Sequence, residues 1–153
     1  MQPRINFKQV APDAYAAMSG LQGYVNKCGL EHSLLELVKM RASQINGCAF
    51  CIAMHSADAV KAGESHERLH LLAAWRETDL YSPRERVALA WTEALTVIAG
   101  KDVSDELYDE ARKQFSEKEL VDLTHAVIAI NGWNRICIAL RVPPVVTKTS
   151  AAA

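Results

Sequence analysis

A break in a helical pattern near the middle of the chain is the sequence feature that most constrains the fold. Apolar residues recur at helical spacing on both sides of Asn46-Gly47. Before the break the apolar pattern is wider than one stripe, so that helix is expected to be buried on much of its surface. Glycine ends helices easily, because it adopts a left-handed backbone conformation without strain. The sequence therefore predicts that one helix ends here and that a second begins at or near Cys48. So short a turn allows the two helices to fold back on each other.

The second helix carries three reactive side chains on one face. At about 100° per residue, Cys48, Cys51 and His55 fall within about 60° of one another. The two cysteines lie in the first turn, where free backbone N–H groups and the helix dipole favour an anion such as a thiolate. His55 follows Cys51 by one helical turn, so it can reach the sulfur and accept its proton. The pattern predicts a pair of cysteines that cycles between dithiol and disulfide.

Glu36 is the carboxylate that best completes this arrangement. It lies on the preceding helix among apolar residues, and it could orient or charge His55. Along a straight helix, about 18 Å would separate Glu36 from Cys48. Contact therefore requires either that the two helices fold back or that another subunit supplies the partner. Taken by itself, Glu36 is more typical of a solvated carboxylate on an exposed helix face.

Helical signals continue through the rest of the chain, and no window shows the sustained alternation of a strand. Ser82-Pro83-Arg84-Glu85 and Ser116 to Glu119 are capping boxes, which begin helices. We expect one all-α domain over residues 1–153, with six to eight helices, a redox core at about 31–64 and a frayed tail at 143–153. The expected helices cover residues 12–28, 31–45, 48–63, 65–78, 82–100, 104–115 and 116–140.

The composition is that of an ordinary globular protein. The chain has 153 residues, half of them hydrophobic, and a net charge of −1. There is no basic stripe for nucleic acid and no apolar run of about 18 residues for a membrane helix, and the first residues lack the apolar core expected of a signal peptide. We therefore expect a cytosolic protein, in which structural disulfides are rare. Cys28 and Cys137 stand apart from the other cysteines, and we interpret them as inert thiols.

Other candidate functional residues are better explained by structural roles. His66 and His70 could chelate a metal from one helix face, but solvent exposure is the simpler interpretation. His125 lies among apolar residues and is expected to be a hydrogen-bonded core histidine. Arg41 is expected to pair with a nearby acid. The tryptophans are expected in the core or at an interface: Trp75, Trp91 and Trp133.

Two alternatives to a redox pair remain open from the residues alone. Cys48 and Cys51 could be two buried thiols without chemistry. They could also ligate a metal together with His55 and Glu36, since this spacing suits such a centre. A second Cys/His cluster and a zinc-ribbon pattern are both missing from the sequence, which disfavours the metal.

The stretch from Glu36 to His55 strongly resembles the core of the AhpD-like alkylhydroperoxidases, within the carboxymuconolactone decarboxylase superfamily. The resemblance continues through Ala57-Asp58-Ala59 and Ala62-Gly63-Glu64. The later stretch Ala129-Ile-Asn-Gly-Trp-Asn-Arg135 is similar to the last long helix of that family. The likeness therefore extends over most of the chain.

This resemblance implies an all-α protein that assembles as trimers or hexamers, and a thiol-dependent peroxidase without haem, flavin or metal. It implies that Cys51 is the peroxidatic cysteine, oxidised to sulfenic acid, and that Cys48 resolves it as a disulfide. His55 and Glu36 would form the proton relay. Phe50 is a departure, because the best-known members have histidine directly before the second cysteine. Those members are re-reduced by a lipoylated partner.

Three functions of different classes follow. The leading hypothesis is a cytosolic peroxidase that reduces organic hydroperoxides or hydrogen peroxide and is regenerated by a dithiol or a lipoylated protein. The second is a decarboxylase or lactone-processing enzyme of the same fold. Such relatives typically lack the paired cysteines, so Cys48 and Cys51 argue against it. The third is a non-enzymatic redox or metal-binding module.

Overall fold

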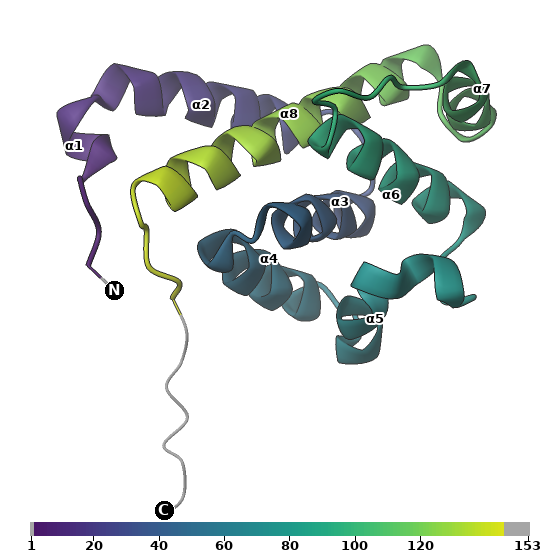
Figure 1. Cartoon of the computed structure of the whole chain (residues 1–153), viewed down its shortest axis with the longest axis horizontal. Coiled ribbons are helices and arrows are strands. Elements are labelled where there is room, and N and C mark those ends of the chain that lie inside the picture. The colour runs from purple at the N-terminus through teal and green to yellow at the C-terminus, as the bar shows by residue number, and fades with distance from the viewer. Residues whose placement is uncertain (1, 146–153) are drawn as a thin grey trace, which may run out of the picture.

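The chain forms a bundle of helices, seen in the computed structural model of Figure 1, which describes residues 2–145. Within this range there are eight α-helices, one 3₁₀ helix and no strand, which confirms the predicted all-α fold. The elements are α1 (Phe7–Val10), α2 (Pro12–Val25), α3 (His32–Asn46), α4 (Ala49–Lys61), α5 (His66–Leu71), η1 (Leu72–Glu77), α6 (Pro83–Thr96), α7 (Asp105–Gln114) and α8 (Glu117–Ala139).

Helix α3 lies at the centre of the bundle and packs against α4, α6 and α8 (Figure 1). Most of its surface is covered, as the wide apolar pattern predicted. Two charged residues, Glu36 and Lys39, are buried along with the apolar ones. The buried polar side chains of this helix therefore need partners in the protein interior.

The turn between α3 and α4 has the predicted geometry. Gly47 adopts a left-handed conformation, with φ of 68°, and ends α3. Cys48 is the N-cap residue of α4, and its backbone N–H donates to the carbonyl of Ser43 at 3.0 Å. The chain reverses over these residues, so that α4 lies along α3 within one subunit.

Three elements differ from the prediction. The first is α1, because residues 1–10 were expected to be extended and Phe7–Val10 is helical. The helix expected over 65–78 is divided into α5 and η1, and Ala74 within η1 has non-helical angles. The tighter turn places Trp75 in the core, where its Nε1 donates to Glu93 at 2.9 Å. Helix α6 ends at Thr96, short of the predicted end at Gly100. Val97 and Ile98 continue the apolar pattern of the sequence, but both side chains are exposed.

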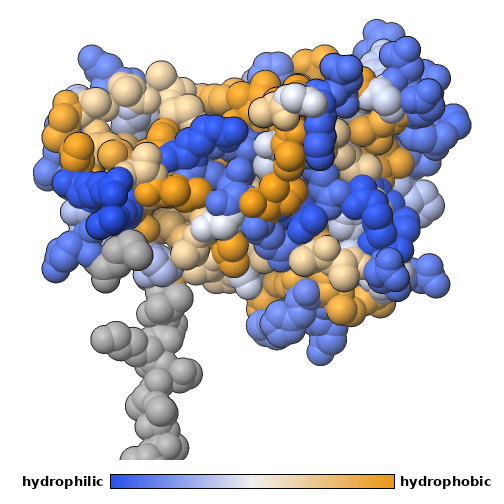
Figure 2. All heavy atoms as spheres, in the orientation of Figure 1, coloured by the Kyte–Doolittle hydropathy of each residue, from blue (hydrophilic) through white to orange (hydrophobic). Residues whose placement is uncertain are grey.

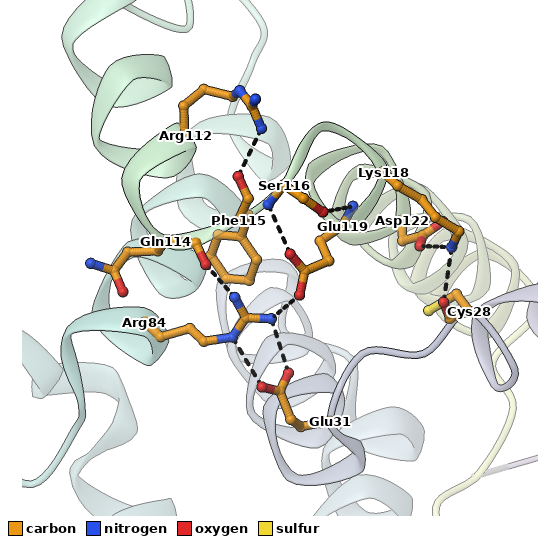
Figure 3. A network of polar contacts seen from close by, with 10 residues as sticks. All are labelled: Cys28, Glu31, Arg84, Arg112, Gln114, Phe115, Ser116, Lys118, Glu119 and Asp122. Carbon is orange, nitrogen blue, oxygen red and sulfur yellow. Dashed lines mark hydrogen bonds and ion pairs between the residues drawn. The ribbon is translucent and has the colours of Figure 1, made fainter.

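Both capping boxes are confirmed, and a single arginine connects the elements around them (Figure 3). Arg84 donates to Glu31 at 3.0 and 3.2 Å and to Glu119 at 2.7 Å. It also donates to the carbonyl of Gln114, and its guanidinium lies 4.1 Å from the centroid of the Phe115 ring. This network fixes the start of α3 against the junction of α7 and α8.

Helix α8 ends at Ala139. After α8, residues 142–145 form no regular structure, and the rest of the predicted frayed tail lies outside the described residues. None of the helices in the described range has the length and apolar character needed to cross a bilayer. On the face drawn in Figure 2, hydrophobic residues form patches between hydrophilic ones.

Candidate active site

The predicted cysteine pair lies where α4 begins. Cys48 caps the helix and Cys51 is in its first turn, and both are almost completely buried, at 1% exposure. Their sulfurs lie within 4.8 Å of each other. All four cysteines of the chain are free thiols in the structure. The geometry therefore suits a dithiol that a small rotation of the side chains could close.

Cys137 joins this pair, contrary to the prediction that it stands apart. It projects from α8, is 5% exposed, and its sulfur also lies within 4.8 Å of those of Cys48 and Cys51. The three thiols belong to one apolar cluster with Ala42 and Ile130. Their contact depends on where α8 crosses the α3–α4 turn, which local sequence patterns do not specify.

A network of amides holds α8 at this crossing. The Nδ2 of Asn46 donates to the side-chain oxygens of Asn131 and Asn134, at 2.9 Å each. Asn134 in turn donates to the hydroxyl of Ser43 at 3.0 Å. This network was not predicted from the sequence. A signal for it was the spacing of Asn131, Asn134 and Cys137, which recur every three residues in the second half of α8.

Contacts among the three sulfurs lower the pKa of Cys48 and raise those of Cys51 and Cys137, so the thiolate forms on Cys48. Hydrogen bonds from Cys137 and Cys51, with a smaller contribution from Asn134, lower the pKa of the Cys48 thiol well below its ordinary value. The contacts with Cys137 and Cys48, together with burial, raise the pKa of Cys51. The contact with Cys48 raises the pKa of Cys137 to about 11. In the reduced protein the proton thus stays on Cys51, which needs a base to become a nucleophile.

Glu36 and His55 form a buried pair across α3 and α4. The Nδ1 of His55 lies 2.8 Å from Oε2 of Glu36, and the two side chains are 8% and 4% exposed. Lys39 donates to the other carboxylate oxygen at 2.6 Å. The interpretation of Glu36 as a solvated carboxylate is wrong, because the fold-back of α4 over α3 encloses it. The partner comes from the same chain.

Glu36 is held as an anion by these two contacts. Burial by itself would raise its pKa, but the hydrogen bonds from His55 and Lys39 outweigh it and lower the pKa to about 2. A carboxylate is an acceptor only, so the Nδ1 of His55 must carry the hydrogen of this bond. In the neutral imidazole the other nitrogen, Nε2, is then free to accept a proton.

An apolar cavity of about 590 Å³ gives access to this site. Its polar wall includes Cys51, Cys137, His55, Glu36 and Lys39, whereas Cys48 is not among the lining residues. Aromatic and aliphatic side chains make up a second part of the wall: Phe7, Tyr15, Phe50, Met54, Trp133 and Val142. The remaining lining residues are polar or charged: Lys8, Gln22, Asn26, His32 and Asp58. A molecule in the cavity therefore meets the sulfur of Cys51 before that of Cys48.

The possible metal ligands do not form one centre. Among the described residues, donor atoms that lie within 4.8 Å of one another form two separate groups. One group contains the three cysteines, and the other contains Glu36, His55 and the exposed Asp58. The set of two cysteines, His55 and Glu36 that the spacing suggested is therefore divided between the two.

The remaining candidates are placed mostly as expected. His66 and His70 are exposed, and Arg41 pairs with Glu93 at 2.7 Å. Two tryptophans are buried, and Trp133 lies on the cavity wall. His125 is only half-buried, because the exposed side of α8 carries it, and its Nδ1 lies 2.8 Å from the carbonyl of Val121.

The helical fold, the Cys-x-x-Cys pair and the buried Glu36–His55 contact together define an AhpD-like protein. The chain belongs to the carboxymuconolactone decarboxylase family, whose model matches residues 12–94. It is 43% identical to the uncharacterized protein YdfG of Bacillus subtilis over 140 residues, which are 92% of this chain and 95% of that protein.

Solved structures share the fold over nearly the whole chain. ATU0492 from Agrobacterium tumefaciens, a protein of unknown function that has been linked to the antioxidant defence protein AhpD, superposes with a TM-score of 0.92. It is 40% identical, and the match covers 95% of this chain and all of the other. The debrominase Bmp8, solved with 2,3,4-tribromopyrrole, has a TM-score of 0.82 at 20% identity, over 95% of this chain and 78% of its own. This second likeness concerns the fold alone.

Proposed function

We propose that this protein is a thiol-dependent peroxidase that reduces organic hydroperoxides. The observation that carries the proposal is a pair of thiols within 4.8 Å of each other, one of which lines a cavity together with a buried histidine–carboxylate pair. Such a site supplies a nucleophile, a base and a second thiol, which are the groups that peroxide reduction requires.

The reaction begins at Cys51, the thiol of the pair that faces the cavity. As the hydroperoxide approaches, the Nε2 of His55 takes the Cys51 proton, and the sulfur attacks the terminal oxygen. The O–O bond breaks, Cys51 becomes a sulfenic acid, and the leaving alkoxide receives a proton to give the alcohol. Glu36, with a pKa of about 2, holds no proton at neutral pH. Its part is to orient His55 and to stabilise the imidazolium.

The thiolate of Cys48 then attacks the oxidised sulfur, an S–S bond forms and the S–O bond breaks. The leaving hydroxide takes a proton from solvent to become water, and a Cys48–Cys51 disulfide remains. The lowered pKa of Cys48 makes it a ready thiolate for this step. An external dithiol, either a small molecule or a lipoylated protein, returns both sulfurs to thiols. We place this cycle in the cytosol, because the thiols must be kept reduced between turnovers.

The walls of the cavity favour a bulky apolar substrate over hydrogen peroxide. Phe50 occupies the position where the best-known relatives have histidine, and it lines the cavity, as do Met54 and Trp133. An aryl or alkyl group buried against these side chains gains about 25 cal/mol for each Å² of apolar surface removed from water. Hydrogen peroxide gains nothing there. We therefore expect cumene hydroperoxide to have the higher kcat/KM.

We also propose that the protein is a homo-oligomer, a trimer or a hexamer. Helix α8 is covered on one side by α2, α3 and α6, yet its other side exposes large apolar side chains. These are Val121, Ile128 and Ile138, which are 53%, 51% and 46% exposed. A face of this kind suits an interface between copies of the chain.

Titration of thiols before and after peroxide tests the function. The reduced protein receives one equivalent of cumene hydroperoxide, and Ellman's reagent then counts the remaining thiols. A peroxidase loses two of its four thiols per chain and recovers them with dithiothreitol. Thiols that do not change would reject the proposal and favour a decarboxylase or lactone-processing enzyme. Co-purified zinc with unreactive thiols would instead favour a metal-binding module.

A further inference from the structure

Cys137 is a buried thiol that the two-cysteine cycle does not use. It comes from α8, whereas Cys48 and Cys51 both belong to the start of α4. Its sulfur lies within 4.8 Å of each of theirs, and all three are at most 5% exposed. Rotation of the side chains with a small shift of the helices can bring such sulfurs to the bonding distance of about 2.05 Å.

The position of Cys137 relative to the cavity sets it apart from Cys48. Cys51 and Cys137 both line the cavity. When Cys51 is oxidised there, a thiol from a separate helix is already in contact with it. The contact does not depend on local flexibility, since the amides of Asn131 and Asn134 fix α8 against the α3–α4 turn.

We propose that Cys137 is a second resolving thiol, which captures oxidised Cys51 as a disulfide that links α4 to α8. The inference rests on the proposed peroxidase function and adds a second reaction that converts the Cys51 sulfenic acid to a disulfide. The sulfur of Cys137 attacks the sulfur of Cys51, an S–S bond forms and the S–O bond breaks. The hydroxyl leaves as water with the Cys137 proton, either directly or through the Cys48 thiolate. The disulfide is then reduced by the same external dithiol.

The two schemes differ in the variant Cys48→Ser. If Cys48 were the only resolving thiol, this variant would stop at the Cys51 sulfenic acid. With Cys137 as a second resolving thiol, it still forms a disulfide. Serine is a favoured N-cap residue, so the substitution suits the start of α4. Circular dichroism and thermal unfolding check that the variant is folded.

The experiment identifies the disulfides by peptide mapping. Each reduced protein receives one equivalent of cumene hydroperoxide. Free thiols are blocked, sulfenic acid is trapped with dimedone, and the chain is cut with trypsin without reduction. Cys48 and Cys51 share the peptide 42–61, whereas Cys137 lies on the peptide 136–141. A Cys48–Cys51 disulfide therefore stays within one peptide, and a Cys51–Cys137 disulfide joins two.

We expect Cys48→Ser to lose two of its three thiols and to give the joined peptides 42–61 and 136–141. Cys137→Ala should give only the disulfide within 42–61. The double variant should keep a dimedone adduct on Cys51. Cys28→Ser is the matched control, because Cys28 lies outside the sulfur cluster and should leave the products unchanged.

The outcomes distinguish a failure of this inference from a failure of the proposed peroxidase function. If wild type loses two thiols but Cys48→Ser gives only the dimedone adduct, Cys137 does not resolve Cys51 and the peroxidase function stands. A disulfide of Cys51 with Cys28, or one between two chains, would also overturn the inference. If wild type loses no thiols, the proposed function fails and the inference fails with it.

Discussion

Replacing Glu36 with glutamine removes the negative charge that holds Lys39 and His55 in the interior. The pKa of the Glu36 carboxyl is lowered from 4.5 to about 2. At 1.36 kcal/mol per pKa unit, these contacts stabilise its charged form by about 3 kcal/mol. Removing one partner of a buried pair typically costs about 3–5 kcal/mol. Because the Lys39 side chain is only 7% exposed, we expect Glu36→Gln to lower the free energy of unfolding by about 3 kcal/mol at pH 7.

This contribution has a defined pH dependence. The pKa of Glu36 is lower in the folded than in the unfolded protein, so its stabilisation is complete above about pH 4.5 and is lost as the pH falls toward 2. In urea unfolding, the difference in stability between wild type and Glu36→Gln should therefore shrink between pH 5 and pH 3. A difference that stays constant over this range would refute the assignment of the lowered pKa to Glu36.

The same substitution should slow peroxide reduction. A glutamine amide can donate to the Nδ1 of His55, which would move the ring hydrogen to Nε2, where the proton of Cys51 must be accepted. We expect the rate of peroxide-driven thiol oxidation to fall by about 10²–10⁴-fold at neutral pH, the usual contribution of general-base catalysis. Activity should recover at high pH, as alkali ionises the thiol directly.

Glu93→Gln is the matched control for this experiment. Glu93 is also a partly buried carboxylate with a lowered pKa, paired with Arg41 and bonded to Trp75, but neither partner lines the cavity. Glu93→Gln should lower stability and leave the pH profile of thiol oxidation unchanged. If folded Glu36→Gln keeps the full rate at neutral pH, Glu36 has only a structural role.

Three further predictions concern the nucleophile, the base and the assembly. Cys51→Ser should abolish peroxide-dependent thiol loss in the Ellman assay, and retained turnover would assign the attack to another sulfur. His55→Ala should slow oxidation by about 10²–10⁴-fold, and adding Glu36→Gln should slow it little more, whereas multiplying effects would show independent roles. Light scattering should give a mass above that of a dimer for wild type and a smaller mass for Ile128→Glu. A monomeric wild type would contradict the proposed interface.

The features that the sequence predicted well depend on local chemistry. A left-handed glycine at Gly47 and the capping boxes at Ser82 and Ser116 act within a few residues of themselves, and all three are confirmed. The wide apolar pattern of α3 likewise predicted its burial correctly. Such signals locate helix ends and buried faces, because they depend on backbone groups and solvent exposure close at hand.

The features that could not be predicted from the sequence depend on how helices that are distant in the chain cross. Glu36 was ambiguous, because only the reversal at Gly47 encloses it beside His55. Cys137 was judged inert because nothing near it in the sequence is reactive, yet α8 carries it to the cysteine pair. A crossing point is determined by the packing of whole helix faces, so one chain's local pattern does not contain it.

The amide network shows what determines this crossing. Apolar side chains tolerate small slips of one helix along another, but buried amides do not, because each loses hydrogen bonds when displaced. Asn46 donates to both Asn131 and Asn134, and Asn134 donates to Ser43, so only one register of α8 satisfies all of them. That same register sets Cys137, one turn beyond Asn134, against the start of α4. The hydrogen bonds of Asn131 and Asn134 thus position the thiol of Cys137, although they do not supply a base that activates it. Whether Cys137 can react with Cys51 therefore depends on these hydrogen bonds.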